Sequence, residues 1–233
     1  MSKILSNELL LTNLLKTYLE TKKKLNKNQN AELEIKFGTR GIKNITKITF
    51  DNVIKQLLAN NFKFKEESKY YLSIKSNNIR SEIIGINNVQ NYCRTNNLPL
   101  EYQNECYSFA IKKPYLSELT DSIYPTVNFD EFNFRISYSI ETELSHDSDD
   151  VKDLLGTWKD NKKFYRLIHR HTMIHDDFPV RIDLSVIRES KKDASEKEGY
   201  DIKESNIFRQ YEKYEIEIEV DNEKLDKVIS NFD

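Results

Sequence analysis

Two stretches near opposite ends of the chain alternate strictly between charged and apolar side chains. Residues 31–38 read Ala-Glu-Leu-Glu-Ile-Lys-Phe-Gly, and residues 214–220 read Tyr-Glu-Ile-Glu-Ile-Glu-Val. Because successive side chains of a β-strand point to opposite faces, each stretch is predicted to be a strand with one acidic face. We expect the two strands to be neighbours, and the crowded carboxylates then require a neutralising cation. An all-carboxylate site suits the hard ions Mg²⁺ and Mn²⁺. The candidate metal ligands are Glu32, Glu34, Glu215, Glu217 and Glu219.

Alternating stretches recur through the chain, with a few helical stretches between them. Further strands are expected at residues 69–76, 78–86, 105–113, 132–141, 163–173 and 179–187. Helices are expected at residues 6–25, 51–60 and 222–230, with a short one opened by Ser148 and stopped by Gly156. The charged stretch 189–206 is expected to be a mobile loop. Frequent sequential strands favour an antiparallel sheet or barrel, so the expected fold class is α+β, mainly β.

Composition and missing motifs exclude several classes of function. The chain has 233 residues, a length at which barrels commonly form one domain, so residues 1–233 are expected to be a single domain. Its net charge of −2 argues against a general duplex-DNA coating protein. No apolar run approaches the ~18 residues of a membrane helix, so no membrane partner is expected. The phosphate-binding P-loop motif and the glycine-rich dinucleotide motif are both missing from the sequence.

The polar faces of the predicted strands also carry cations. These are Lys36, Arg80, Lys112, Arg135, Arg166, Arg170 and Arg181. Guanidinium and ammonium groups both bind phosphate well. Carboxylates, a metal and cations together are the usual equipment for phosphoryl transfer.

The architecture consistent with such polar faces is a closed eight-stranded antiparallel barrel with a polar lumen. Its apolar strand faces would point outwards and be covered by helices, and a barrel of eight strands has room for one small ligand. A polyphosphate tail is such a ligand. The competing interpretation is an ordinary sheet whose polar face lies in water.

The two glutamate strands resemble those of the triphosphate tunnel metalloenzymes. A helix precedes the first strand and Phe-Gly follows its lysine, which resembles the RNA 5′-triphosphatases of fungal, protozoal and large-DNA-virus mRNA capping, including giant-virus enzymes of the mimivirus type. The thiamine-triphosphatase and class IV adenylyl cyclase branch is less similar. Residues 135–141 and 181–185 also resemble strands of the capping branch. The likeness spans residues 31–220 and implies the eight-stranded tunnel fold.

The resemblance implies an enzyme that uses Mg²⁺ or Mn²⁺ to remove the terminal phosphate of triphosphate-ended RNA. It implies that the five glutamates hold the metal, with Glu217 and Glu219 as direct ligands and Glu215 as a bridge to a water or a basic group. Hydrolysis of free NTPs with Mn²⁺ is also expected. Partner guanylyltransferase and methyltransferase domains of a larger capping enzyme would follow, as would an intracellular, cytoplasmic location or, for a viral protein, the virion or viral factory.

The resemblance also assigns roles to other residues. Glu141 matches a glutamate that positions or deprotonates the attacking water, and Asp183 matches a residue that orients the basic groups. Arg80, Lys112, Arg170 and Arg181 match catalytic cations of the tunnel, and Lys36, Arg135 and Arg166 join them as phosphate ligands. Ile168 departs from the pattern because a further cation is expected there. Either the register of that strand is shifted or the tunnel has one charge fewer.

Two other functions remain open at the level of sequence. The same fold could act on free nucleoside triphosphates or inorganic tripolyphosphate. Comparing hydrolysis rates on triphosphate-ended RNA, ATP and tripolyphosphate would separate these functions. A non-catalytic phosphate-binding module is the other alternative, although an anion binder gains nothing from carboxylates without a metal.

Overall fold

The computed structural model of the protein describes residues 7–38, 43–98, 107–114, 126–190 and 201–230. The described strands are β1 (Gln29–Phe37), β2 (Lys63–Phe64), β3 (Lys69–Ser76), β4 (Ile79–Ile84), β5 (Tyr107–Pro114), β6 (Thr126–Phe129), β7 (Phe134–Glu143), β8 (Phe164–Ile174), β9 (Val180–Glu189) and β10 (Lys213–Val220). The described α-helices are α1 (Asn7–Lys22), α2 (Lys47–Ala59), α3 (Ile86–Thr95), α4 (Asp149–Gly156) and α5 (Asn222–Ser230). Two short 3₁₀ helices, η1 (Asp130–Phe132) and η2 (Ile207–Arg209), complete the described elements.

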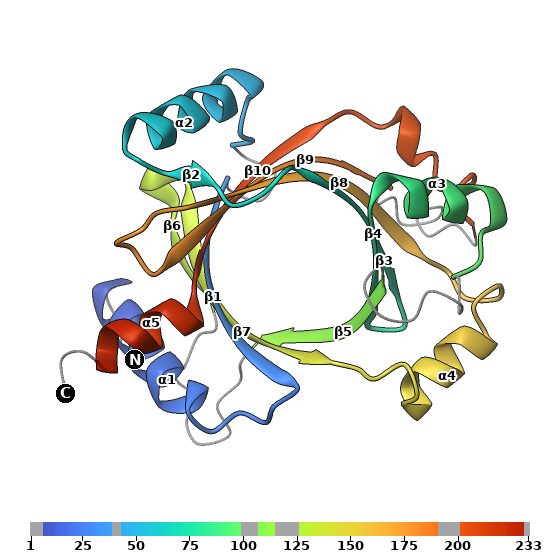
Figure 1. Ribbon diagram of the computed structural model, residues 1–233, viewed down its shortest axis with the longest axis horizontal. Helices are drawn as coiled ribbons and strands as arrows, with labels where there is room; N and C mark the ends of the chain where they lie inside the picture. Colours follow the sequence, from blue (N-terminus) through green and yellow to red (C-terminus); the bar gives the residue numbers. More distant parts are fainter. Residues whose placement is uncertain (1–6, 39–42, 99–106, 115–125, 191–200, 231–233) are drawn as a thin grey trace, which may run out of the picture.

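Eight of these strands close into an antiparallel barrel (Figure 1). The order around the ring is β1-β10-β9-β8-β3-β4-β5-β7, and β7 pairs back onto β1 from Phe37–Phe134 to Gln29–Thr142. The second edge of β7 is divided, because β5 pairs with its C-terminal half and β6 with its N-terminal half. The short strand β2 pairs with β8 outside the ring order. The predicted fold, a closed eight-stranded antiparallel barrel with helices outside, is confirmed.

The outward faces of the strands are apolar and are covered by the helices. α1 packs on β1 and β7 through Leu14 and Tyr18, and α2 packs through Phe50 on the cluster that holds Leu184 and Ile216. Burying a large apolar side chain stabilises the fold by about 1.5–3 kcal/mol, so this covering holds each strand in one orientation. The polar faces are left pointing into the lumen.

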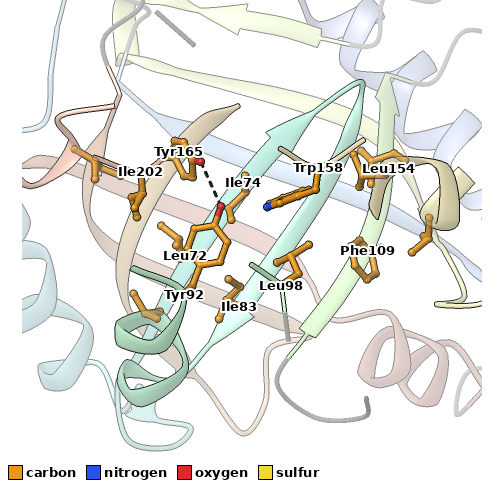
Figure 2. Close-up of a cluster of buried hydrophobic side chains, with 14 residues drawn as sticks. Leu72, Ile74, Ile83, Tyr92, Leu98, Phe109, Leu154, Trp158, Tyr165 and Ile202 are labelled. Carbon is orange, nitrogen blue, oxygen red and sulfur yellow. Dashed lines mark hydrogen bonds between the residues drawn. The ribbon is translucent and has the colours of Figure 1, made fainter. Parts of the chain in front are cut away.

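The largest apolar cluster lies under α3 and α4. Figure 2 shows Tyr92 of α3 facing Tyr165 of β8, and their hydroxyl groups are 3.3 Å apart. Trp158, which follows α4, is buried in the same cluster and donates a hydrogen bond from Nε1 to the backbone oxygen of Asn96. Ile202 is buried there too, so the described part of the predicted 189–206 loop contributes to the core. Residues 191–200 of that stretch lie outside the described residues.

Most element boundaries agree with the sequence patterns, and the differences have local causes. Asn77 and Asn78, both with positive φ, form the tight turn between β3 and β4 that the pattern predicts. α2 begins four residues earlier than expected because the side chain of Thr46 caps its first turn. The missed elements include α3 (residues 86–95) and the short strands β2 (residues 63–64) and β6 (residues 126–129), and the 3₁₀ helices η1 and η2 were not expected either. Residues 6, 105 and 106 of the predicted elements lie outside the described residues.

None of the helices in the described ranges is both long enough and apolar enough to cross a membrane.

Candidate functional site

The two glutamate strands are neighbours, as the sequence predicts. β1 and β10 run antiparallel, with Glu34 directly opposite Glu219 and Lys36 opposite Glu217. Their alternate residues, such as Leu33 and Ile216, are buried in the outer clusters. A slip of one residue would turn the glutamates into those apolar clusters, so the packing fixes the register that points the carboxylates inwards.

Charged side chains in this part of the lumen fall into two groups, which differ in their balance. We call the first the Glu217 cluster; it consists of Lys36, Arg166, Arg170, Asp183, Glu215 and Glu217. We call the second the Glu219 cluster; it consists of Glu32, Glu34, Lys112, Arg181 and Glu219. The first has three cations and three carboxylates, and the second has two cations and three carboxylates.

The Glu217 cluster is fully paired. The ammonium of Lys36 binds Glu217 and lies 2.9 Å from Glu215, while Arg166 lies 2.8 Å from the same Glu215 oxygen. Arg170 lies 3.4 Å from Asp183 and 3.9 Å from Glu217. Burial would raise the pKa of Glu217, but Lys36 and the arginines outweigh it and lower that pKa to about 2. Glu217 is therefore held as a carboxylate by protein cations alone.

The Glu219 cluster carries one carboxylate more than its cations neutralise. Lys112 bridges the two acids of β1, at 2.6 Å from Glu32 and 3.2 Å from Glu34. Arg181 lies 2.6 Å from Glu219. Burial raises the pKa of Glu219 to about 7 against the pull of Arg181, and the charge of Glu32 adds to the rise. An added positive charge would therefore be favourable here.

The predicted metal site is not assembled as such within the described part of the chain, where no group of three or more carboxylate, histidine or cysteine side chains is arranged to hold an ion. Lysine and arginine side chains occupy the space between the carboxylates instead. The donor set still fits Mg²⁺ or Mn²⁺, because the Glu219 cluster offers carboxylate oxygens from two neighbouring strands and an uncompensated negative charge.

Glu141, the predicted water-positioning residue, faces the lumen from β7. It pairs with Arg80, whose Nε lies 3.4 Å from Glu82. Burial raises the pKa of Glu141 above its usual value, although Arg80 opposes the rise. A carboxylate with a raised pKa is suited to accept a proton near neutral pH.

One end of the lumen, where β1 ends and β10 begins, opens into a cavity of about 680 Å³. Gly38 turns the chain away from β1 with a φ of +93°, which favours glycine, and its N–H donates to the backbone oxygen of Asn133. The lining residues that concern the lumen are Lys36, Arg135, Phe164, Arg166 and Glu215. We call this cavity the tunnel mouth.

Every predicted site residue therefore lies on the lumen side of its strand. Ile168 does so as well, so the register of β8 is not shifted and the tunnel has one cation fewer there. Ile168 is buried between Tyr71 of β3 and Ile187 of β9, and Arg170 lies over the ring of Tyr71 at 5.6 Å. The ring of Tyr71 and the side chains of Ile84, Ile168 and Ile187 make an apolar wall.

Two polar contacts of the lumen were not predicted. Ser137 donates a hydrogen bond of 3.0 Å to Glu34, and Thr172 donates one of 2.6 Å to Asp183. Both residues share the strand face of the predicted cations, Ser137 next to Arg135 and Thr172 next to Arg170. The alternation of inward and outward side chains along each strand was the signal from which both residues could have been predicted to face the lumen.

Comparison with solved structures reveals similar folds. The triphosphatase of the Mimivirus capping enzyme is 13% identical, with 95% of this chain and 94% of that chain covered at a TM-score of 0.57. The Schizosaccharomyces pombe Pct1 RNA triphosphatase is 13% identical, with 95% and 81% covered at 0.47. The same protein in complex with the Spt5 CTD is 11% identical, with 91% and 80% covered at 0.47.

No protein-family model and no curated protein matches the sequence. The family resemblance read from the glutamate strands thus agrees with a similarity that is visible in the structure, between chains that are aligned over nearly their whole lengths. The closed ring of eight strands, with its charged lumen, has the triphosphate tunnel fold.

Proposed function

We propose that this protein is a metal-dependent RNA 5′-triphosphatase, which removes the γ-phosphate of triphosphate-ended RNA in the first step of mRNA capping. The observation that carries the proposal is the pairing of β1 with β10, which brings glutamates from two distant segments into one lumen lined by lysines and arginines. An anion binder would gain nothing from these carboxylates, because they repel phosphate unless a metal lies between them.

The Glu219 cluster is the place where the metal would bind, with Glu32, Glu34 and Glu219 as its ligands. Glu217 is the next lumen-facing residue on β10 and would join them only by giving up Lys36. Glu215, which contacts Lys36 and Arg166, orients those cations. When bound, Mg²⁺ or Mn²⁺ would withdraw charge from the phosphate oxygens as a Lewis acid.

The cations of the lumen supply the rest of the electrostatics. Arg80, Lys112, Arg170 and Arg181 would neutralise the phosphate oxygens, and Asp183 holds Arg170 in position from 3.4 Å. Water would attack the γ-phosphorus in line, forming a new O–P bond while the bond to the β-phosphate oxygen breaks. Glu141 would take the proton of the water, and the RNA would leave with a diphosphate end.

The same lumen has a second candidate substrate class. Its cations recognise phosphate groups, so free NTPs and inorganic tripolyphosphate are also expected to be hydrolysed, and one of them could be the preferred substrate. In a capping pathway, the diphosphate end would pass to guanylyltransferase and methyltransferase domains, and the reaction would take place inside the cell.

The proposal is tested by phosphate release from triphosphate-ended RNA, ATP and tripolyphosphate, each with Mn²⁺, with Mg²⁺ and with EDTA. We expect release from the RNA that requires the metal and leaves a diphosphate end. A Glu20→Ala variant, altered at an exposed residue of α1, is the matched control and should behave as the wild type. Failure to release phosphate with either metal would disprove the proposal, and a strong preference for tripolyphosphate would replace RNA as the substrate.

A further inference from the structure

The tunnel mouth is larger than a phosphate chain needs. Its volume of about 680 Å³ lies within the range of pockets that hold nucleotide-sized ligands, roughly 300–1,000 Å³. It opens at the end of the lumen where Lys36, Arg166 and Glu215 belong to both the cavity and the Glu217 cluster. The cavity is therefore continuous with the polar lumen and is accessible from one end of the barrel.

Arg135 stands out among the charged residues of the mouth. Arg166 is paired with Glu215 and Glu189, and Lys213 is paired with Glu189. The half-buried side chain of Arg135 forms no ion pair or side-chain hydrogen bond with any described residue, and it lies directly opposite Lys36. Like charges opposite each other on paired strands are unfavourable. Glu215 and Glu217 offset the charge of Lys36, whereas Arg135 has no carboxylate partner among the described residues.

Two groups at the mouth are suited to contact a base. Phe164, at the first position of β8, and Arg135 both line the cavity. Aromatic rings and arginine planes are the groups on which proteins stack unpaired bases. An arginine without a carboxylate partner keeps its planar face available for such a contact.

We propose that the tunnel mouth holds the nucleoside that carries the triphosphate, with Arg135 and Phe164 as its contacts. This inference rests on the proposed function, in which the terminal phosphate lies at the Glu219 cluster. The phosphate chain then passes Lys36, which reaches Glu217 from the mouth, and the first nucleoside emerges beside Arg135. Arg135 is thus a specificity-determining residue that separates nucleoside triphosphates and RNA ends from bare tripolyphosphate, and it is not a ligand of the reacting phosphate.

The test compares binding and turnover in wild type, Arg135→Ala and Arg135→Lys. Binding of a short triphosphate-ended RNA, labelled at its 3′ end, is measured by anisotropy, with ATP and tripolyphosphate as competitors. We expect Arg135→Ala to weaken RNA and ATP binding by roughly tenfold or more, as for the loss of one stacking contact, and tripolyphosphate binding to stay within about twofold. Arg135→Lys keeps the positive charge but lacks the planar guanidinium, so it should bind RNA and ATP nearly as weakly as Arg135→Ala.

Arg94→Ala is the matched control, because it removes an arginine from the exposed last turn of α3. Melting curves of each variant check that the barrel is intact. An equal loss for RNA and tripolyphosphate would overturn the inference, as would full rescue by lysine, unchanged RNA binding in Arg135→Ala or no RNA binding by the wild type. If the wild type binds RNA and Arg135→Ala weakens only RNA and ATP binding, but no phosphate is released, the proposed function is disproved and the nucleoside site is still supported.

Discussion

The Glu217 cluster and the Glu219 cluster lie on the same strand faces and arise from the same alternating pattern, yet they are electrostatically different. Both glutamates are partly buried, and this desolvation alone would raise the pKa of each. Lys36 and its neighbours reverse that effect at Glu217, whose pKa is about 2. At Glu219 the charge of Arg181 opposes the effect of burial without reversing it, and the pKa is about 7. The neighbours supplied by other strands, and not the motif, decide which carboxylate is already neutralised.

This difference separates a structural role from a ligand-binding one. Three cations balance three carboxylates in the Glu217 cluster, so it needs no added ion to be stable. The Glu219 cluster is short of one positive charge, and a divalent cation would remove the deficit. The following predictions challenge this division.

The largest expected effect is on the rate of phosphate release. Glu32→Ala removes a carboxylate from the Glu219 cluster, and loss of one such electrostatic group commonly costs about 10²–10³ in rate. Metal-dependent release from triphosphate-ended RNA should fall by that factor, while Glu20→Ala should not change it. Wild-type rates in Glu32→Ala, or in its isosteric relative Glu32→Gln, would contradict the assignment.

Glu217→Gln should affect stability most. The change leaves Lys36 and Arg170 with one carboxylate fewer inside the lumen. Breaking a fully buried ion pair typically costs about 3–5 kcal/mol, and these partly buried groups, which keep Glu215 and Asp183, should lose less than that. Urea unfolding without metal should show a lower midpoint than in the wild type. Glu219→Gln should not show this loss, because it removes charge from a cluster that has too much of it, and an equal drop in both variants would erase the distinction.

Mn²⁺ should stabilise the wild type against heat. An ion that binds only the folded state at a hundred times its Kd adds about 2.7 kcal/mol. At roughly 2–4 °C per kcal/mol for a chain of this length, the melting temperature should rise by about 5–11 °C. Glu219→Gln should lose this shift. Ca²⁺-free buffer with EDTA gives the baseline, and a Mn²⁺ shift that persists in Glu219→Gln would place the ion elsewhere.

The smallest effect is on the pH dependence of stability without metal. The pKa of Glu219 in the folded state is above its ordinary value of 4.5, so the folded state takes up a proton as the pH falls from 7 to 4.5 and gains stability in that window. Glu217 acts in the opposite sense, because its stabilising effect is lost below pH 4.5. Thermal melting between pH 5 and 7 should show the gain in the wild type and less of it in Glu219→Gln.

Strand faces could be predicted from the sequence, whereas the partners of each charge could not. Alternation within 31–38 and 214–220 was enough to place the glutamates on one face, because side-chain direction is a local property of a strand. Lys112 bridges Glu32 and Glu34 because of the order of strands around the ring, in which β5 and β1 both pair with β7. No local pattern contains that order.

The missed elements have the same explanation. α3 has few apolar residues, and Val89 and Tyr92 hold it in place only by packing into the core under it. β6 is four residues long and exists through its pairing with β7. The sequence could not decide whether the strand of Ile168 is shifted in register or lacks one cation. Only the pairing with β3 and β9 fixes the register of β8.

The apolar wall around Ile168 gives the lumen two unlike sides. Tyr71 and Ile168 belong to β3 and β8, and β3 stands across the ring from β1. The aliphatic side chain of Ile168 offers charged oxygens no hydrogen-bond partner, and the ring face of Tyr71 offers none apart from its hydroxyl. A poorly polarisable surface facing the acids of β1 weakens the local screening, so every charge in the passage is felt over a longer range than in an evenly wetted pore.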